Sequence, residues 1–110
     1  MHNDTLLDQL KSKLKIIITE SYKDNKFELE KDLNTFLEIS REKLERWLFL
    51  FSSGNLTEED LEWLLKSQFN LMEFQALQTT GISKIKLNAI KNNILKMIFK
   101  VLLDLVIPRG

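Results

Sequence analysis

Residues 82–108, ISKIKLNAIKNNILKMIFKVLLDLVIP, decide the fold because nothing inside the stretch has to stop a helix before its final residue. Gly81 precedes it, and Pro108, the chain's single proline, ends it. From residue 94 onward, at about 100° per residue, apolar side chains cover roughly two-thirds of the helix circumference. Lys96, Lys100 and Asp104 keep one narrow polar stripe. A helix this apolar must run through the middle of a bundle or bury part of itself in another chain.

The rest of the composition agrees with a helical, folded domain. The chain has 110 residues, of which 44% are hydrophobic and 29% are charged, so it can bury a core as one domain over residues 1–110. Its three glycines and one proline lie near the ends or between periodic segments. That scarcity favours a few long helices over many strands joined by turns.

The hydrophobic spacing predicts an antiparallel, all-α, four-helix bundle-like domain with a long C-terminal helix. We expect helices over about residues 4–23, 27–51, 58–80 and 82–106, with Asp4 as the first N-cap. The second helix has the most regular apolar seam, in which the polar Ser40 is the one exception. The spacing of this seam is 4-3-4-4-3-4 over Leu29, Leu33, Phe36, Ser40, Leu44, Trp47 and Phe51.

Turn chemistry places a corner between the second and third helices. Gly54 suits a left-handed residue just past a helix end, and Thr57 is positioned to cap the amide of Asp60 at the next helix start. The third helix is less regular, since Trp63 and Phe74 lie almost opposite its main apolar face. A break with a new N-cap at Asn70 would make five helices, and the sequence leaves this alternative open.

Chemistry-bearing residues are few. The chain has no cysteine and one histidine, His2, at a terminus, and it has no glycine-rich phosphate loop. We therefore expect no catalytic residues, no metal site, no cofactor and no enzymatic activity. The N-terminus does not resemble a secretory signal, and charges interrupt the apolar C-terminal stretch, so we expect a cytoplasmic protein with no membrane span.

The leading functional hypothesis is a small interaction or assembly module that forms a homodimer or a larger assembly. It would self-associate through the apolar surface of the C-terminal helix, because large apolar patches left exposed on a monomer promote aggregation. The candidate partner interface consists of Phe49, Leu50, Leu95, Phe99, Leu102, Leu103 and Val106.

Two other functions stay open. Residues 71–93 resemble a DNA-binding helix-turn-helix around a Gly-Ile-Ser turn, and the resemblance implies nucleic-acid contacts by Lys84, Lys86, Asn88 and Lys91. Leu77 departs from the pattern, since such motifs usually need alanine there for close helix packing.

Residues 82–110 carry six bases and one acid, and residues 28–62 carry ten acids and four bases. The two regions could complement each other, or the basic one could meet an acidic partner. A third hypothesis is the carriage of an apolar ligand within the bundle.

Overall fold

The computed structural model describes residues 6–106, and within this range the chain forms only helices and turns. The predicted all-α class with a long C-terminal helix is confirmed. Asp4, the expected first N-cap, lies outside the described residues. The elements in chain order are α1 (Leu6–Ser21), the 3-10 turn η1 (Lys23–Asn25), α2 (Lys26–Ile39), α3 (Arg41–Ser52), α4 (Glu58–Asn70), α5 (Gln75–Gln78) and α6 (Lys84–Val106).

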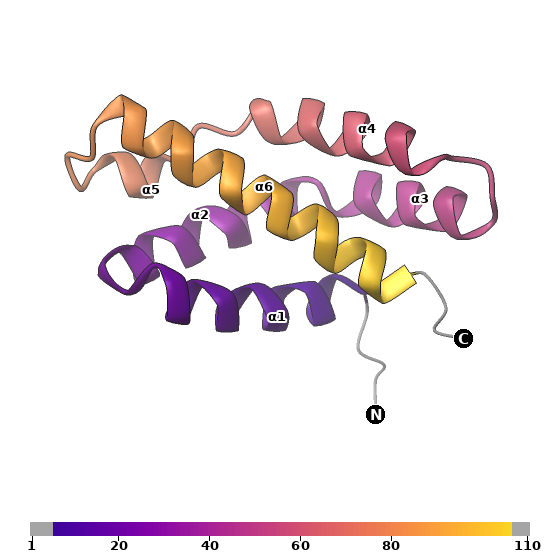
Figure 1. Ribbon diagram of the computed structural model, residues 1–110, viewed down its shortest axis with the longest axis horizontal. Helices are drawn as coiled ribbons and strands as arrows, with labels where there is room; N and C mark the ends of the chain where they lie inside the picture. The colour runs from indigo at the N-terminus through magenta and orange to yellow at the C-terminus, as the bar shows by residue number, and fades with distance from the viewer. Residues whose placement is uncertain (1–5, 107–110) are drawn as a thin grey trace.

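The long helix α6 crosses the other helices diagonally, as Figure 1 shows. It packs against α1 on one side and α4 on the other, and it also contacts α3. Helices α2 and α3 follow one another in the same general direction, with α1 antiparallel to α2 and α4 antiparallel to α3 (Figure 1). Short connections force this antiparallel arrangement because the chain has to turn back at once.

The predicted helix over residues 27–51 is wrong in one respect, because it is broken at Ser40. The break is a single residue with φ −97° and ψ 6°, and hydrogen bonds from Ser40 N to Phe36 O and from Leu44 N to Ser40 O surround it. The buried Ser40 hydroxyl accepts a hydrogen bond from Gln68 Nε2 of α4 at 3.1 Å. The apolar seam therefore continues across the break, and the hydrogen bond between Ser40 and Gln68 joins the junction of α2 and α3 to α4.

The corner between α3 and α4 has the predicted chemistry. Gly54 has φ +84°, and the amides of Gly54 and Asn55 donate to Phe51 O and Leu50 O, which is a Schellman motif. Thr57 and Asp60 form a reciprocal capping box, with hydrogen bonds of 3.0 and 3.1 Å between each backbone amide and the other residue's side chain. Local hydrogen bonds therefore fix both the end of α3 and the start of α4.

The predicted helix over residues 58–80 is interrupted after Asn70, which agrees with the alternative of a broken third helix. Asn70 is the last residue of α4, however, and the next helix begins only at Gln75, so the expected N-cap at Asn70 is wrong. Phe74 precedes α5 in the left-handed conformation with φ 49°, and its side chain is fully buried. Trp63, opposite the core face of α4, is exposed.

The core uses one face of every long helix. Phe69 of α4 contacts Phe36 and Phe74 edge-to-face, with ring centroids 5.1 and 5.3 Å apart. The predicted polar stripe of α6, at residues 96, 100 and 104, is exposed as expected. The opposite face of α6 is buried within its own chain and consists of Leu87, Ile90, Ile94, Ile98, Val101 and Leu102.

Candidate protein-interaction surface

The predicted interface on α6 is largely taken up by the chain itself. Leu102 is 0% exposed, so it belongs to the core and has no surface to offer a partner. Leu95, Phe99 and Leu103 are half-buried. The side chain of Val106 lies outside the described part of the structure. The apolar excess that the sequence places in this helix is thus mostly covered by α1, α3 and α4.

A shallow groove remains between α4 and α6. Leu95 and Phe99 line it together with charged side chains of both helices, and its volume is about 380 Å3. Phe49 and Leu50, the other predicted interface residues, belong to α3 and are absent from its wall. Phe49 is exposed and Leu50 is half-buried. This groove therefore brings together only two of the predicted interface residues, Leu95 and Phe99.

Several large apolar side chains outside this groove are strongly exposed, and three of them lie on α2 or beside its end. Phe27 is 77% exposed at the start of α2, Ile39 is 71% exposed at its end, and Leu71 is 74% exposed in the connection between α4 and α5. A single exposed apolar residue is ordinary on a protein surface, so the arrangement of these three decides whether they can act together. The other exposed large apolar residues in the described range are Ile16, Phe49, Trp63 and Ile85.

Helical spacing places part of this group on one line. Phe27, Lys31, Thr35 and Ile39 follow one another at intervals of four residues, which puts them on one ridge that is about 18 Å long and winds by about 120° around α2. We call these four residues the α2 stripe. The Thr35 hydroxyl donates to the backbone oxygen of Lys31 at 3.0 Å, which turns it back onto its own helix. The stripe thus has an apolar residue at each end and less bulky or flexible side chains in the middle.

Two adjoining grooves connect the α2 stripe to Leu71. One, of about 550 Å3, runs along the outer face of α2 and includes the whole stripe. The other, of about 570 Å3, lies between α2 and residues 71–79 and includes Ile39, Leu71 and Met72. Both grooves share Lys31, Thr35 and Ile39. We call the groove between α2 and residues 71–79 the α2–α5 groove. Together with the stripe, it is the candidate interaction surface.

Two charged side chains, Asp32 and Lys91, bind the segment that forms the wall of the α2–α5 groove opposite α2. The Asp32 carboxylate of α2, 4% exposed, accepts hydrogen bonds from the amides of Ala76 at 3.0 Å and Leu77 at 2.8 Å. These amides lie in the first turn of α5, where a carboxylate is favoured by both hydrogen bonding and the helix dipole. Lys91 Nζ of α6 donates to the backbone oxygen of residue 72 at 3.2 Å and lies 5.6 Å from the centre of the Phe74 ring.

The sequence reasoning did not single out Asp32, although a signal for it existed. Asp32 lies three residues after Leu29 and four before Phe36, so the apolar periodicity of α2 places this acid on the core-facing side. A carboxylate on an apolar face needs a hydrogen-bond partner from another element. The partner itself could not be read from the sequence, since it is the backbone of a one-turn helix more than 40 positions away.

The four candidate nucleic-acid contacts do not form one basic face. Lys84, Lys86 and Asn88 are exposed, but Lys91 is half-buried and bonded to Met72 as described above. Lys86 lies on the side of α6 that faces η1, in a hollow between the two elements. The helix before the Gly81 turn, α5, has only four residues, whereas the first helix of a helix-turn-helix must be long enough to cross the DNA backbone. These features give the nucleic-acid hypothesis no support.

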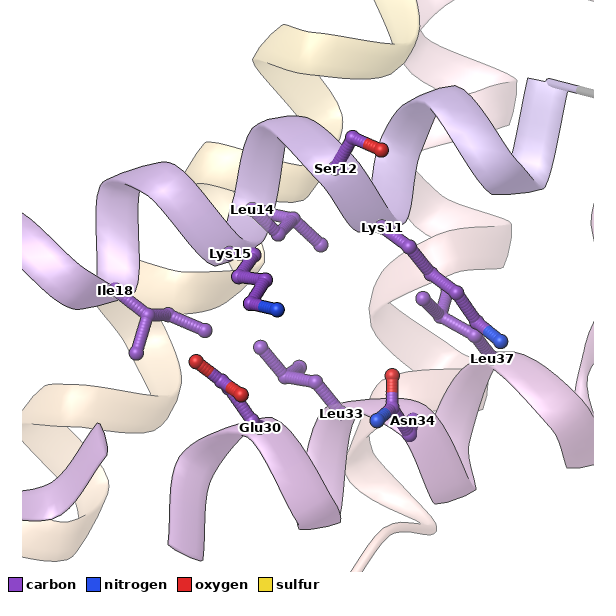
Figure 2. Close-up of a pocket in the computed structure, with 9 residues that line it drawn as sticks. All are labelled: Lys11, Ser12, Leu14, Lys15, Ile18, Glu30, Leu33, Asn34 and Leu37. Carbon is purple, nitrogen blue, oxygen red and sulfur yellow. The ribbon is translucent and has the colours of Figure 1, made fainter. Parts of the chain in front are cut away.

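A further cleft, of about 270 Å3, lies between α1 and α2. Figure 2 shows Lys15 of α1 and Glu30 of α2 pointing into it above an apolar floor supplied by both helices. Within the described residues, Glu30 Oε2 is buried and has no hydrogen-bond partner. Lys11, which also borders the cleft, is paired with Glu38 at 3.2 Å. The remaining charges of Lys15 and Glu30 are opposite and equal, so the cleft selects neither anions nor cations.

The described residues offer little other chemistry. Between residues 6 and 106, no group of three or more His, Asp or Glu side chains is arranged to hold a metal ion. His2 lies outside this range. The grooves described above all have charged side chains in their walls, which does not support the hypothesis of an apolar-ligand carrier. No helix in the described part of the chain is long and apolar enough to cross a bilayer.

Searches with protein-family models, against curated proteins and against solved structures found no match to this chain. Any function assigned to the chain therefore depends on its own residues and their geometry.

Proposed function

We propose that this chain is a small, non-enzymatic helical module that acts through protein–protein contact and self-associates. The observation that carries the proposal is the placement of Phe27, Ile39 and Leu71, each more than 70% exposed, on the borders of two adjoining grooves. The proposal keeps the kind of function that the sequence favours but moves the surface from α6 to α2 and the residues that follow α4.

The physical argument is the cost of hydrating these side chains. Fully burying one Phe, Leu or Ile side chain is favourable by about 1.5 to 3 kcal/mol relative to leaving it in water. Apolar side chains grouped beside hollows can be buried together by one partner, so their contributions act in one contact. The groove between α2 and residues 71–79 also gives a partner surface a shape to fill, which a flat patch would not.

The non-enzymatic part of the proposal comes from composition. Without cysteine, and with its single histidine at position 2, the chain lacks the side chains that most often act as nucleophile or general base near neutral pH. Its carboxylates on α3 and at the start of α4 lie on exposed faces or serve as helix caps. A role in binding or assembly makes no demand on such groups.

Sedimentation velocity, together with size-exclusion chromatography and light scattering, tests the proposal on the full 110-residue chain. We expect the weight-average mass to rise from that of the 13.0 kDa monomer to at least its dimer between low and high micromolar concentration. A chain that stays monomeric and soluble throughout this range would contradict self-association. Circular dichroism on the same samples shows whether the protein is helical during the measurement.

A further inference from the structure

We propose that the α2 stripe pairs antiparallel with the same stripe of a second copy, and that Phe27 of each copy enters the α2–α5 groove of the other. This inference rests on the proposed function and specifies the surface and geometry of self-association. The occupant to which it commits is a second copy of this chain.

A protruding side chain and a groove that could receive it lie at opposite ends of α2. Phe27 projects at the start of α2, and the α2–α5 groove, bordered by Ile39 and Leu71, opens at its end. An antiparallel pair of identical helices brings the start of each against the end of the other. Because the stripe is inclined to the helix axis, two antiparallel α2 helices that cross at about 50°, around a two-fold axis near the level of residue 33, would place each Phe27 beside the partner's Ile39 and Leu71. Such an isologous contact is closed, so it produces a dimer and not a fibre.

The middle of the α2 stripe carries the positive charge of Lys31. In this register Lys31 lies opposite Thr35 of the second copy and within one turn of that copy's Glu38. The Glu38 side chain is 60% exposed and already binds Lys11 Nζ of its own chain at 3.2 Å. The ion pairs found within residues 6–106 do not include Lys31. In the dimer, Glu38 would therefore lie between Lys11 of its own chain and Lys31 of the other copy, and each Lys31 would also offset the approach of Glu28 to the other copy's Glu38.

The exposed apolar area of each copy is close to the apolar area that a standard dimer interface buries. At the exposures given above, Phe27, Ile39 and Leu71 leave on the order of 400 Å2 of apolar side-chain surface per copy. A standard interface buries about 800 Å2 per partner, of which somewhat more than half is non-polar. The three side chains therefore supply most of the apolar part of such an interface. Lys31 and Thr35 lie near the two-fold axis, and Glu38 and Glu73, which border the grooves, supply polar side chains around the apolar contacts.

The experiment measures the dimer dissociation constant of charge and apolar variants by sedimentation. Lys31→Glu is expected to raise the constant by about tenfold or more, because it places a second carboxylate against Glu38 of the other copy. The double variant Lys31→Glu/Glu38→Lys exchanges the two charges and is expected to restore dimerisation to near the parent level. Phe27→Ser and Ile39→Ser are each expected to weaken the dimer by about tenfold or more.

Matched controls keep the two proposals separable. Phe49→Ser, Trp63→Ser and Ile85→Ser each remove an exposed apolar side chain away from the α2 stripe, and they are expected to leave the dissociation constant unchanged. If the parent dimerises and only these controls weaken it, the α2 pairing is wrong while self-association stands. A charge-swap variant no tighter than Lys31→Glu alone would overturn the proposed register. A parent chain that never dimerises would overturn both proposals.

Discussion

The carboxylate of Asp32 accepts a hydrogen bond from the backbone amide of Leu77 at 2.8 Å, although the two residues are 45 positions apart. A second bond, from the amide of Ala76, uses the other carboxylate oxygen. The start of α5 is therefore capped by a side chain of another helix, since Phe74 at its own N-cap position makes no side-chain cap. This contact orders residues 71–79, which form one wall of the α2–α5 groove.

Replacing Asp32 with alanine should lower the free energy of unfolding by roughly 2 to 4 kcal/mol, because two amides lose charge-assisted hydrogen bonds in a buried site. Urea denaturation followed by circular dichroism measures the loss. Asp32→Asn keeps one acceptor and should lose about half as much. Glu42→Ala, at an exposed position of α3, is the control and should change stability by less than about 0.5 kcal/mol. Equal losses for Asp32→Ala and Glu42→Ala would show that the cap contributes nothing.

Lys91 should matter for stability and not for nucleic-acid binding. Lys91→Met keeps the apolar part of the side chain but removes the ammonium group that contacts Met72 O and the Phe74 ring. We expect a loss of about 1 to 2 kcal/mol in urea denaturation. Lys84→Ala and Lys86→Ala, both at exposed positions, should be close to neutral.

The same three variants test the helix-turn-helix alternative. Fluorescence anisotropy with labelled duplex DNA at low salt is expected to detect no binding by the parent chain. Salt-sensitive binding that weakens with Lys84→Ala and Lys86→Ala would contradict this expectation and revive the alternative.

The hydrogen bond between Ser40 and Gln68 should show energetic coupling. A double-mutant cycle with Ser40→Ala, Gln68→Ala and the combined variant is expected to give a coupling energy of about 0.5 to 1.5 kcal/mol. The Ser40 hydroxyl is fully buried, so removing Gln68 alone leaves it without this donor. Additive losses would mean that the contact does not stabilise the junction between α2 and α3.

Gly54→Ala tests the corner between α3 and α4. A Cβ at Gly54 would meet no atom within 4 Å, so the cost of the change comes from the left-handed backbone alone. We expect a loss of about 1 to 2 kcal/mol, measured as a lower thermal midpoint. Gly54→Asn should lose less, because asparagine tolerates this conformation better than alanine does. An alanine variant as stable as the parent would contradict a left-handed residue at this position.

Features that depend on neighbouring residues could be predicted from the sequence. The capping box of Thr57 and Asp60 and the left-handed Gly54 involve hydrogen bonds over a few positions, so their residue types indicate them directly. The apolar spacing also predicts which face of each long helix is buried. It could not reveal the break at Ser40, since the seam keeps its spacing on both sides and the stabilising donor, Gln68, comes from another helix.

The candidate surface was harder to predict because it depends on which apolar residues remain uncovered. The sequence correctly locates a large apolar surface on α6, but Leu102 and its neighbours find partners in α1, α3 and α4. Phe27 and Ile39 lie on a helix that already has a complete apolar seam on its other side. Leu71 becomes exposed only because α4 stops at Asn70. Exposure is thus a property of the assembled helices and cannot be assigned to any one of them.

The remote cap on α5 also has a consequence for local opening of the molecule. A helix of four residues has too few internal bonds to persist alone, and its amides would exchange rapidly with solvent deuterium if it moved independently. With Ala76 and Leu77 bonded to Asp32, these amides can exchange only when α5 separates from α2. Their exchange rates would therefore report how often α5 separates from α2 while the rest of the protein remains folded.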